Sequence, residues 1–193
     1  MLYELVKSAR SCRGFDENVK LSREQLEALV ELARLSPSSV NLQPLKYYIS
    51  CTAESNEKIF VLTHWAGMLK EKKLPYEGHR PTAYIVIFHD TSITPATPAF
   101  LKDAGIVAEV MYLGAAEMGL AGCMIGSFDT ALMQQATGTE ASLLPVLVLA
   151  LGRADETARL TDIPQGGSTA YYRDENDVHC VPKRSLEEII LNK

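Results

Sequence analysis

Two short segments of the chain carry side chains suited to a phosphorylated ligand with a planar ring. Residues 10–15, Arg-Ser-Cys-Arg-Gly-Phe, place two guanidinium groups and a hydroxyl within four positions, and the planar fork of arginine suits phosphate oxygens. Residues 37–44, Pro-Ser-Ser-Val-Asn-Leu-Gln-Pro, are a run of small polar side chains and amides between two prolines. Because proline lacks an N–H and restricts the residue before it, this run predicts a rigid polar loop. The first segment can hold an anion, and the second can hold the edge of a polar ring.

The motifs of several other enzyme classes are missing from the chain. There is no GxGxxG after a strand, no Walker A loop, no HExxH and no GxSxG. The four histidines are isolated in the sequence, which predicts surface or structural roles for them. The sequence therefore predicts neither a metal site nor a nucleophilic triad, and an enzyme of this kind usually takes its chemistry from a cofactor.

The first arginine segment follows a short helical pattern. Leu2, Leu5 and Val6 have helical spacing, so a first helix should deliver Arg10 and Arg13 near its C-terminal end. If the turn continues, the two arginines share one face at i and i+3. The alternative is a solvated basic helix end that the helix dipole favours.

The remaining pattern mixes helices and strands without a strict βαβ alternation, which favours an α+β fold. Capping boxes open helices at Ser22 and Ser185, and Gly119 should end the longest helix. That helix, over residues 99–118, is apolar on most sides and suits a large interface or the centre of a monomer. Further helices are expected over 54–73, where Gly67 is a candidate break, and over 128–137. Strands are expected over 46–51, 83–89, 121–125 and 144–151.

Composition places the chain among ordinary globular proteins. Its 193 residues, 47% hydrophobic and 22% charged, suit a single domain over 1–193. The net charge of −5 argues against a nucleic-acid surface. The sequence has no apolar run of membrane-spanning length and no signal-peptide pattern. Four scattered cysteines then predict reduced thiols, mostly buried, in a cytoplasmic protein.

The two opening segments resemble the nitroreductase family, which carries an Arg-Ser-x-Arg-x-Phe element followed by Pro-Ser-x-x-Asn-x-Gln-Pro. The resemblance continues in the family's order through Asp103-Ala104-Gly105 and residues 119–126, 145–152 and 181–186, and so spans nearly the whole chain. It implies a central, mainly antiparallel sheet flanked by helices, in a homodimer with a long apolar interface helix. It also implies FMN as cofactor, NADH or NADPH as electron donor, and no catalytic side chain.

The resemblance also assigns residues to parts of the flavin. Arg10 and Ser11 correspond to phosphate ligands, Arg13 to a cation near N1 and O2, and the backbone of Gly126 to a contact near N5. The loop after residue 36 reaches the flavin from the second subunit. The full set of expected cofactor-binding residues is Arg10, Ser11, Arg13, Pro37, Ser38, Ser39, Asn41, Met124, Ile125, Gly126, Ser127, Gly152 and Arg153.

The chain departs from the family at Ala9, where many members have a further basic residue. Arg153, after the last buried strand, is one candidate substitute for that phosphate contact. An ordinary exposed loop arginine is the equal alternative. Cys12 lies inside the motif, but the family's chemistry needs no thiol nucleophile there.

The function implied is electron transfer from NAD(P)H to a small electrophilic acceptor, such as a nitroaromatic or quinone, by a ping-pong mechanism. Loop 64–80 and the extended, partner-contacting segment 153–177 are expected to set specificity. The alternatives are a flavin-storage or redox-regulatory protein, and a helical dimer without a cofactor.

Overall fold

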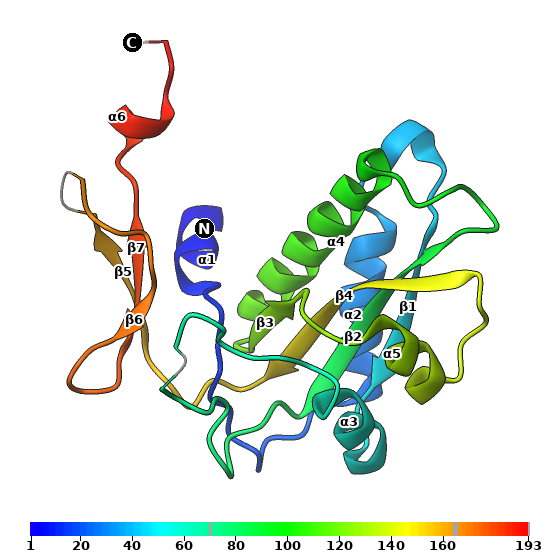
Figure 1. The fold of residues 1–193 in the computed structure, drawn as a ribbon, viewed down its shortest axis with the longest axis horizontal. Coiled ribbons are helices and arrows are strands. Elements are labelled where there is room, and N and C mark those ends of the chain that lie inside the picture. The colour runs from blue at the N-terminus through cyan, green and yellow to red at the C-terminus, as the bar shows by residue number, and fades with distance from the viewer. Residues whose placement is uncertain (70, 164–165, 193) are drawn as a thin grey trace.

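A four-stranded antiparallel sheet forms the centre of the structure, a computed structural model that describes residues 1–69, 71–163 and 166–192. Its strands lie in the order β1-β2-β4-β3, and every neighbouring pair is antiparallel (Figure 1). All residues of β2 except Asp90 are buried, as the continuous β-type run predicts. The strands are β1 (Leu45–Ser50), β2 (Ala83–Asp90), β3 (Ala121–Ile125) and β4 (Leu143–Gly152), so all four expected strands are confirmed.

Helices cover both faces of this sheet. The long helices α2 (Arg23–Arg34) and α4 (Pro98–Glu117) pack on the face that carries Ile85 and Ile87. The shorter helices α3 (Ala53–Phe60) and α5 (Thr130–Thr137) pack on the face that carries Val86 and Phe88. Alternate residues of β2 therefore contribute to two separate apolar layers, which confirms the α+β fold.

Local sequence signals set the ends of several helices. The Ser22 hydroxyl accepts from the Gln25 N–H, and the Gln25 side chain accepts from the Ser22 N–H at 2.9 Å, which is the expected capping box. Ser185 and Glu188 cap α6 (Leu186–Ile189) in the same way. Beyond the end of α4, Gly119 has a φ of +72°, a conformation that glycine adopts without steric cost.

Two expected helical stretches are shorter than the sequence predicts. Helix α1 (Leu2–Ser8) ends before Arg10, so the turn that would place both arginines on one helix face does not continue. Residues 9–14 instead run beside β3, where the Cys12 N–H donates to the Gly122 carbonyl at 2.7 Å. Helix α3 ends at Phe60, whose carbonyl accepts from the Thr63 hydroxyl at 2.7 Å. The described residues between Phe60 and β2 are irregular, which corrects the helix expected over 54–73.

The C-terminal part of the chain forms a second, three-stranded sheet. Its strands are β5 (Ala158–Asp162), β6 (Tyr172–Arg173) and β7 (His179–Lys183), in the order β5-β7-β6, with β5 parallel to β7. Figure 1 shows this small sheet on the far side of α1 from α4. The sequence pattern predicts none of these strands, because their residues are mostly half-buried or exposed.

The proline-flanked segment forms a tight loop beside the N-terminal end of α4. It contains one 3-10 turn, η1 (Ser39–Asn41), and positive φ angles at Val40, Asn41 and Gln43. Figure 1 shows this turn at the opposite end of α4 from β3. Among the described residues, no helix is long and apolar enough to cross a membrane.

Candidate functional site

A cavity of about 290 Å³ lies where residues 9–13 meet α4, β3 and the small C-terminal sheet. Arg10, Ser11 and Arg13 of the first arginine segment all line it, although they do not share a helix. The other lining residues come from distant parts of the chain: Ala9, Glu109, Tyr112, Met124, Tyr171, His179, Val181 and Lys183.

Positive charge dominates the lining of this cavity. Arg10, Arg13 and Lys183 contribute three cations, and Glu109 is the one carboxylate among the described lining residues. The Nε atoms of both arginines are buried and have no hydrogen-bond partner among the described residues. The cavity therefore carries more cationic groups than carboxylates, and an anionic ligand would balance this excess. The donor set therefore fits a phosphate group.

The tail of the chain holds the Arg13 guanidinium from two sides. Arg13 Nη1 lies 3.0 Å from His179 Nε2, and Arg13 Cζ lies 4.7 Å from the ring centre of Tyr171. Arginine cannot accept a hydrogen bond, so His179 Nε2 is the acceptor. Burial, followed by the positive charges of Arg13 and Arg173, lowers the pKa of His179 from 6.5 to about 4. The ring is thus neutral at physiological pH.

The depressed pKa of His179 predicts a pH-dependent stability. Between pH 6.5 and about 4 the unfolded chain protonates this histidine and the folded chain does not, so stability falls as the pH falls through that window. The loss should reach about 2 kcal/mol between pH 6.5 and pH 5, at 1.36 kcal/mol per pH unit. Urea unfolding of the wild type and His179→Gln at both pH values measures it. An equal loss in the two proteins would show that His179 does not titrate as described.

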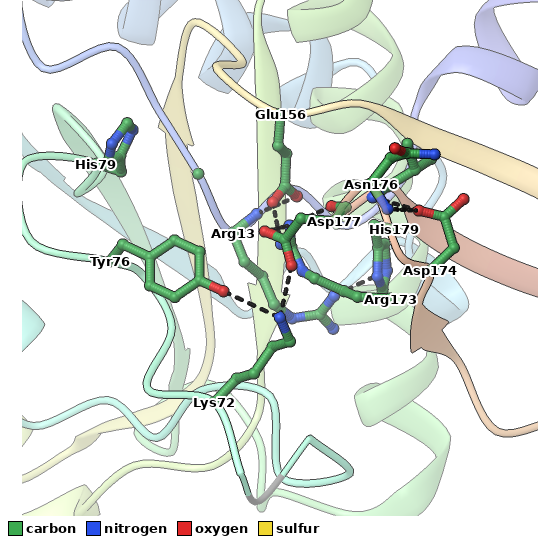
Figure 2. Close-up of polar contacts among 12 residues, drawn as sticks. Arg13, Lys72, Tyr76, His79, Glu156, Arg173, Asp174, Asn176, Asp177 and His179 are labelled. Carbon is green, nitrogen blue, oxygen red and sulfur yellow. Dashed lines mark hydrogen bonds and ion pairs between the residues drawn. The ribbon is translucent and has the colours of Figure 1, made fainter.

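Beneath Arg13, charged side chains form a continuous chain of contacts (Figure 2). The Arg13 backbone N–H donates to Glu156 Oε1 at 2.7 Å, and Glu156 Oε2 pairs with Arg173. Arg173 also pairs with Asp177 at 3.0 Å, and Asp177 accepts from Lys72 Nζ at 2.6 Å. The side chains of Arg173 and Glu156 are only 3% and 7% exposed. This network joins the loop that carries Lys72 to the backbone of the arginine segment.

The serines of the proline-flanked loop face α4. The Ser38 and Ser39 hydroxyls each donate to the Asp103 carboxylate at 2.7 Å. Burial alone would raise the pKa of Asp103, but these hydrogen bonds lower it below 3.8. Asp103 lies nine positions before the cavity residue Tyr112, about 14 Å along the helix axis. Within one chain, the loop residues Pro37, Ser38, Ser39 and Asn41 are not among the residues that line the cavity.

The expected flavin-edge residues lie at and beyond the end of β3. Met124 lines the cavity and Ile125 is buried in the core. Gly126 and Ser127 are exposed beyond the strand, and the Ser127 carbonyl accepts from the His64 N–H at 2.9 Å. Their backbone contacts with a cofactor stay predictions.

Two further expected residues, Gly152 at the end of β4 and Arg153 after it, lie outside the cavity lining. A side chain at Gly152 would place its Cβ 2.7 Å from the Phe15 ring, so close packing requires the glycine. The Arg153 guanidinium pairs with the Asp16 carboxylate. A phosphate contact from Arg153 therefore stays a prediction without support from the cavity.

Comparison with known proteins decides the family. The sequence model of the nitroreductase family matches residues 6–153. The chain belongs to the nitroreductase family. That match includes the arginine segment, the proline-flanked loop and all four strands of the central sheet.

Individual relatives agree with this family assignment. The chain is 28% identical over 156 residues to an oxygen-insensitive NADPH nitroreductase of Helicobacter pylori, a match covering 65% of this chain and 74% of that protein. The fold of the present chain matches that of a nitroreductase family protein of Streptococcus pneumoniae over all of both chains, with a TM-score of 0.72 and 18% identity. A nitroreductase of Desulfitobacterium hafniense with bound FMN matches over 81% of this chain and 90% of that one, with a TM-score of 0.64 and 20% identity.

Sequence reasoning missed several residues of this nitroreductase family cavity. Lys183 belongs to a tail that resembles the family, but only the pairing of β7 with β5 and β6 shows where that tail lies. His179 is not isolated in space as its sequence context indicates, since it contacts Arg13. Tyr112 could not be distinguished from the apolar residues around it in the sequence of α4. In the structure its hydroxyl donates to the Gly122 carbonyl at 2.7 Å.

Cys12 is buried beneath the cavity, and its surroundings support the expectation that it is no nucleophile. Its thiol donates to the Gly14 carbonyl at 3.1 Å, and burial, followed by the charge of Glu156, raises its pKa to about 12. Because the thiolate is the nucleophilic form, we expect Cys12→Ser to retain most NAD(P)H oxidation activity in a steady-state assay. Loss of turnover with flavin still bound would overturn this assignment.

Proposed function

We propose that this chain is an FMN-dependent oxidoreductase that takes electrons from NADH or NADPH and passes them to a small electrophilic acceptor. The observation that carries the proposal is one cavity lined by three cationic side chains, Arg10, Arg13 and Lys183, and by the hydroxyl-bearing Ser11. Family membership and the NADPH nitroreductase relative support the same activity.

The residues of the cavity have separate roles in this proposal. Arg10, Ser11 and Lys183 bind the phosphate of FMN, with Lys183 supplying the cation missing at Ala9. Arg13 provides the fixed positive charge near the pyrimidine edge of the flavin. Bound FMN supplies the chemistry by accepting a hydride from the nicotinamide and donating electrons onward. The side chains orient and polarise, so no acid or base residue is required. Donor and acceptor bind in turn, which gives ping-pong kinetics.

The phosphate assignment can be tested by comparing two ligands. FMN and riboflavin share the ring and the ribityl chain, but only FMN carries a phosphate. A charge-assisted contact is worth roughly 1.5–3 kcal/mol, so we expect apoprotein to bind FMN at least about tenfold more tightly than riboflavin. Lys183→Ala should reduce the ratio of the riboflavin Kd to the FMN Kd. Lys58→Ala, on an exposed face of α3, should leave that ratio unchanged. Equal affinities for FMN and riboflavin in the wild type would contradict the phosphate site.

We further propose that two copies of the chain share each flavin site. The cavity of one chain, at about 290 Å³, lies at the lower limit of ligand pockets, which span roughly 300–1,000 Å³. The proline-flanked loop lies at the other end of α4 and exposes Val40 (85% exposed) and Leu42 (43%). Leu101 on α4 is also half exposed. In this arrangement the loop of one copy completes the cavity of the other.

A heterodimer experiment tests the shared site. A dimer of one Asn41→Ala chain and one Arg13→Ala chain carries both defects in one shared site and none in the other. We therefore expect about half of the wild-type FMN capacity, measured by flavin stoichiometry on doubly tagged dimers. Each homodimer variant serves as the control with both sites weakened. Loss of all high-affinity sites, or a stable monomer that binds FMN fully, would contradict sharing.

A further inference from the structure

Among the described residues, the hydrogen-bond and ring contacts of the Arg13 side chain come from the last third of the chain. His179 Nε2 lies 3.0 Å from Arg13 Nη1, and the Tyr171 ring covers the guanidinium with 4.7 Å between Arg13 Cζ and the ring centre. The backbone of Arg13 is fixed separately, by Glu156 at 2.7 Å. Arg13 itself is only 8% exposed. Its orientation is therefore set before any ligand binds.

The contact with His179 decides which part of the guanidinium is left for a ligand. It is the only hydrogen bond from the Arg13 side chain among the described residues, and it uses Nη1. Nε is buried and has no partner among the described residues, whereas Nη2 has no hydrogen bond there and is not buried, so Nη2 is the donor that Arg13 offers to the cavity. Since a guanidinium presents its donors as a rigid planar fork, fixing Nη1 also fixes the direction of the edge that carries Nη2.

We propose that His179 is a positioning residue that aims the free edge of Arg13 at the pyrimidine side of the flavin. The inference rests on the proposed FMN site and deepens it. Histidine suits this task because its neutral ring accepts from Arg13 without neutralising the positive charge. A carboxylate in the same place would form an ion pair and cancel the charge that the flavin needs.

A purely structural role for His179 makes a different prediction. The ring is 1% exposed and packs edge-on against Tyr171, with 5.3 Å between the ring centres. If His179 only filled space, its removal would destabilise the apoprotein and affect FMN binding equally whether or not Arg13 is present.

A double-mutant cycle in FMN affinity separates the two roles. His179→Leu removes the acceptor and should raise the FMN Kd about tenfold, the expected effect of one hydrogen bond to a charged group. The same substitution in an Arg13→Ala background should change the Kd by less than about twofold. His79→Gln is the control, because His79 contacts Asp155 at 2.9 Å outside this cavity, and it should leave the Kd unchanged. Additive effects of His179→Leu and Arg13→Ala would overturn the proposal.

Two amide variants keep the test decisive if His179→Leu folds poorly. A glutamine oxygen reaches the position of the histidine Nε2, and an asparagine oxygen does not. His179→Gln should therefore keep the FMN Kd within about threefold of the wild-type value. His179→Asn should raise the FMN Kd as much as His179→Leu does. The reduction potential of bound flavin should fall in His179→Asn but not in His179→Gln, because only the former misplaces the cation. Indistinguishable amide variants would refute the positioning role.

The outcome also separates this inference from the proposed function. If the wild type binds no FMN, the FMN site fails and the inference fails with it. If the wild type binds FMN but the cycle is additive, the site stands and the positioning role of His179 is wrong.

Discussion

Arg13→Ala is expected to weaken FMN binding about ten- to hundred-fold, the equivalent of one charge-assisted contact worth roughly 1.5–3 kcal/mol. The guanidinium lines the cavity with its Nε unpaired, so the substitution removes a donor that nothing else replaces. The substitution leaves the neutral His179 without its partner, and this destabilises the fold less than an unpaired buried charge would. Fluorescence titration of apoprotein with FMN measures the change.

The matched control for this substitution is Arg80→Ala. Like Arg13, Arg80 stacks on an aromatic ring, with 4.2 Å between its Cζ and the ring centre of Phe60, and it pairs with Glu57 at 2.8 Å, but it lies outside the cavity. We expect its removal to leave the FMN Kd unchanged. Unchanged affinity in Arg13→Ala, or an equal loss in both variants, would remove Arg13 from the site.

Glu156→Ala is expected to lower the free energy of unfolding by about 3 kcal/mol. Removing one partner of a buried ion pair typically costs 3–5 kcal/mol, because the other charge stays buried without compensation. Arg173 would retain Asp177, at 3.0 Å, so the lower part of that range applies. The substitution also frees the Arg13 N–H that Glu156 holds. Urea unfolding of the apoprotein at pH 7 measures the loss.

Glu57→Ala is the comparison for Glu156→Ala. Both variants remove a glutamate from an arginine, but the Glu57–Arg80 pair is about half exposed, and exposed pairs contribute about 0–1 kcal/mol. A second variant, Glu156→Ala with Arg173→Met, should recover part of the lost stability, since it leaves no buried charge. A loss below about 1 kcal/mol for Glu156→Ala would mean that the buried network contributes little to the fold.

Local sequence signals were sufficient for the strands of the central sheet and for most of the helices that cover it, but not for the end of α3. The Ser22 and Ser185 capping boxes involve residues three positions apart, and the burial of β2 follows from a continuous apolar run. Both features depend on residues that are close together in the chain, so they can be recognised from a single sequence. Arg10 and Arg13 could be identified as candidate anion-binding residues from their side-chain chemistry, and both line the same cavity in the structure.

The remainder of the site depends on contacts that are distant in sequence. Arg13 and His179 are 166 positions apart, and the parallel pairing of β5 with β7 has no local signature. The helical spacing before Arg10 suggested a longer helix, but the Cys12 N–H pairs with the Gly122 carbonyl instead, and this tertiary contact overrides the local preference. The contact of His179 with Arg13 could not be predicted, because a single histidine in a tail carries no pattern.

The proposed flavin chemistry is tested most directly by an anaerobic absorbance titration of the purified protein. We expect a yellow protein with a flavin spectrum and one FMN per chain, whose visible flavin absorbance bleaches on adding NADH or NADPH. Admission of a nitroaromatic or quinone should then restore the colour. A flavin spectrum that neither nicotinamide bleaches would indicate storage rather than turnover. A colourless protein that FMN cannot reconstitute would contradict the claim that Arg10, Ser11, Arg13 and Lys183 form a flavin site.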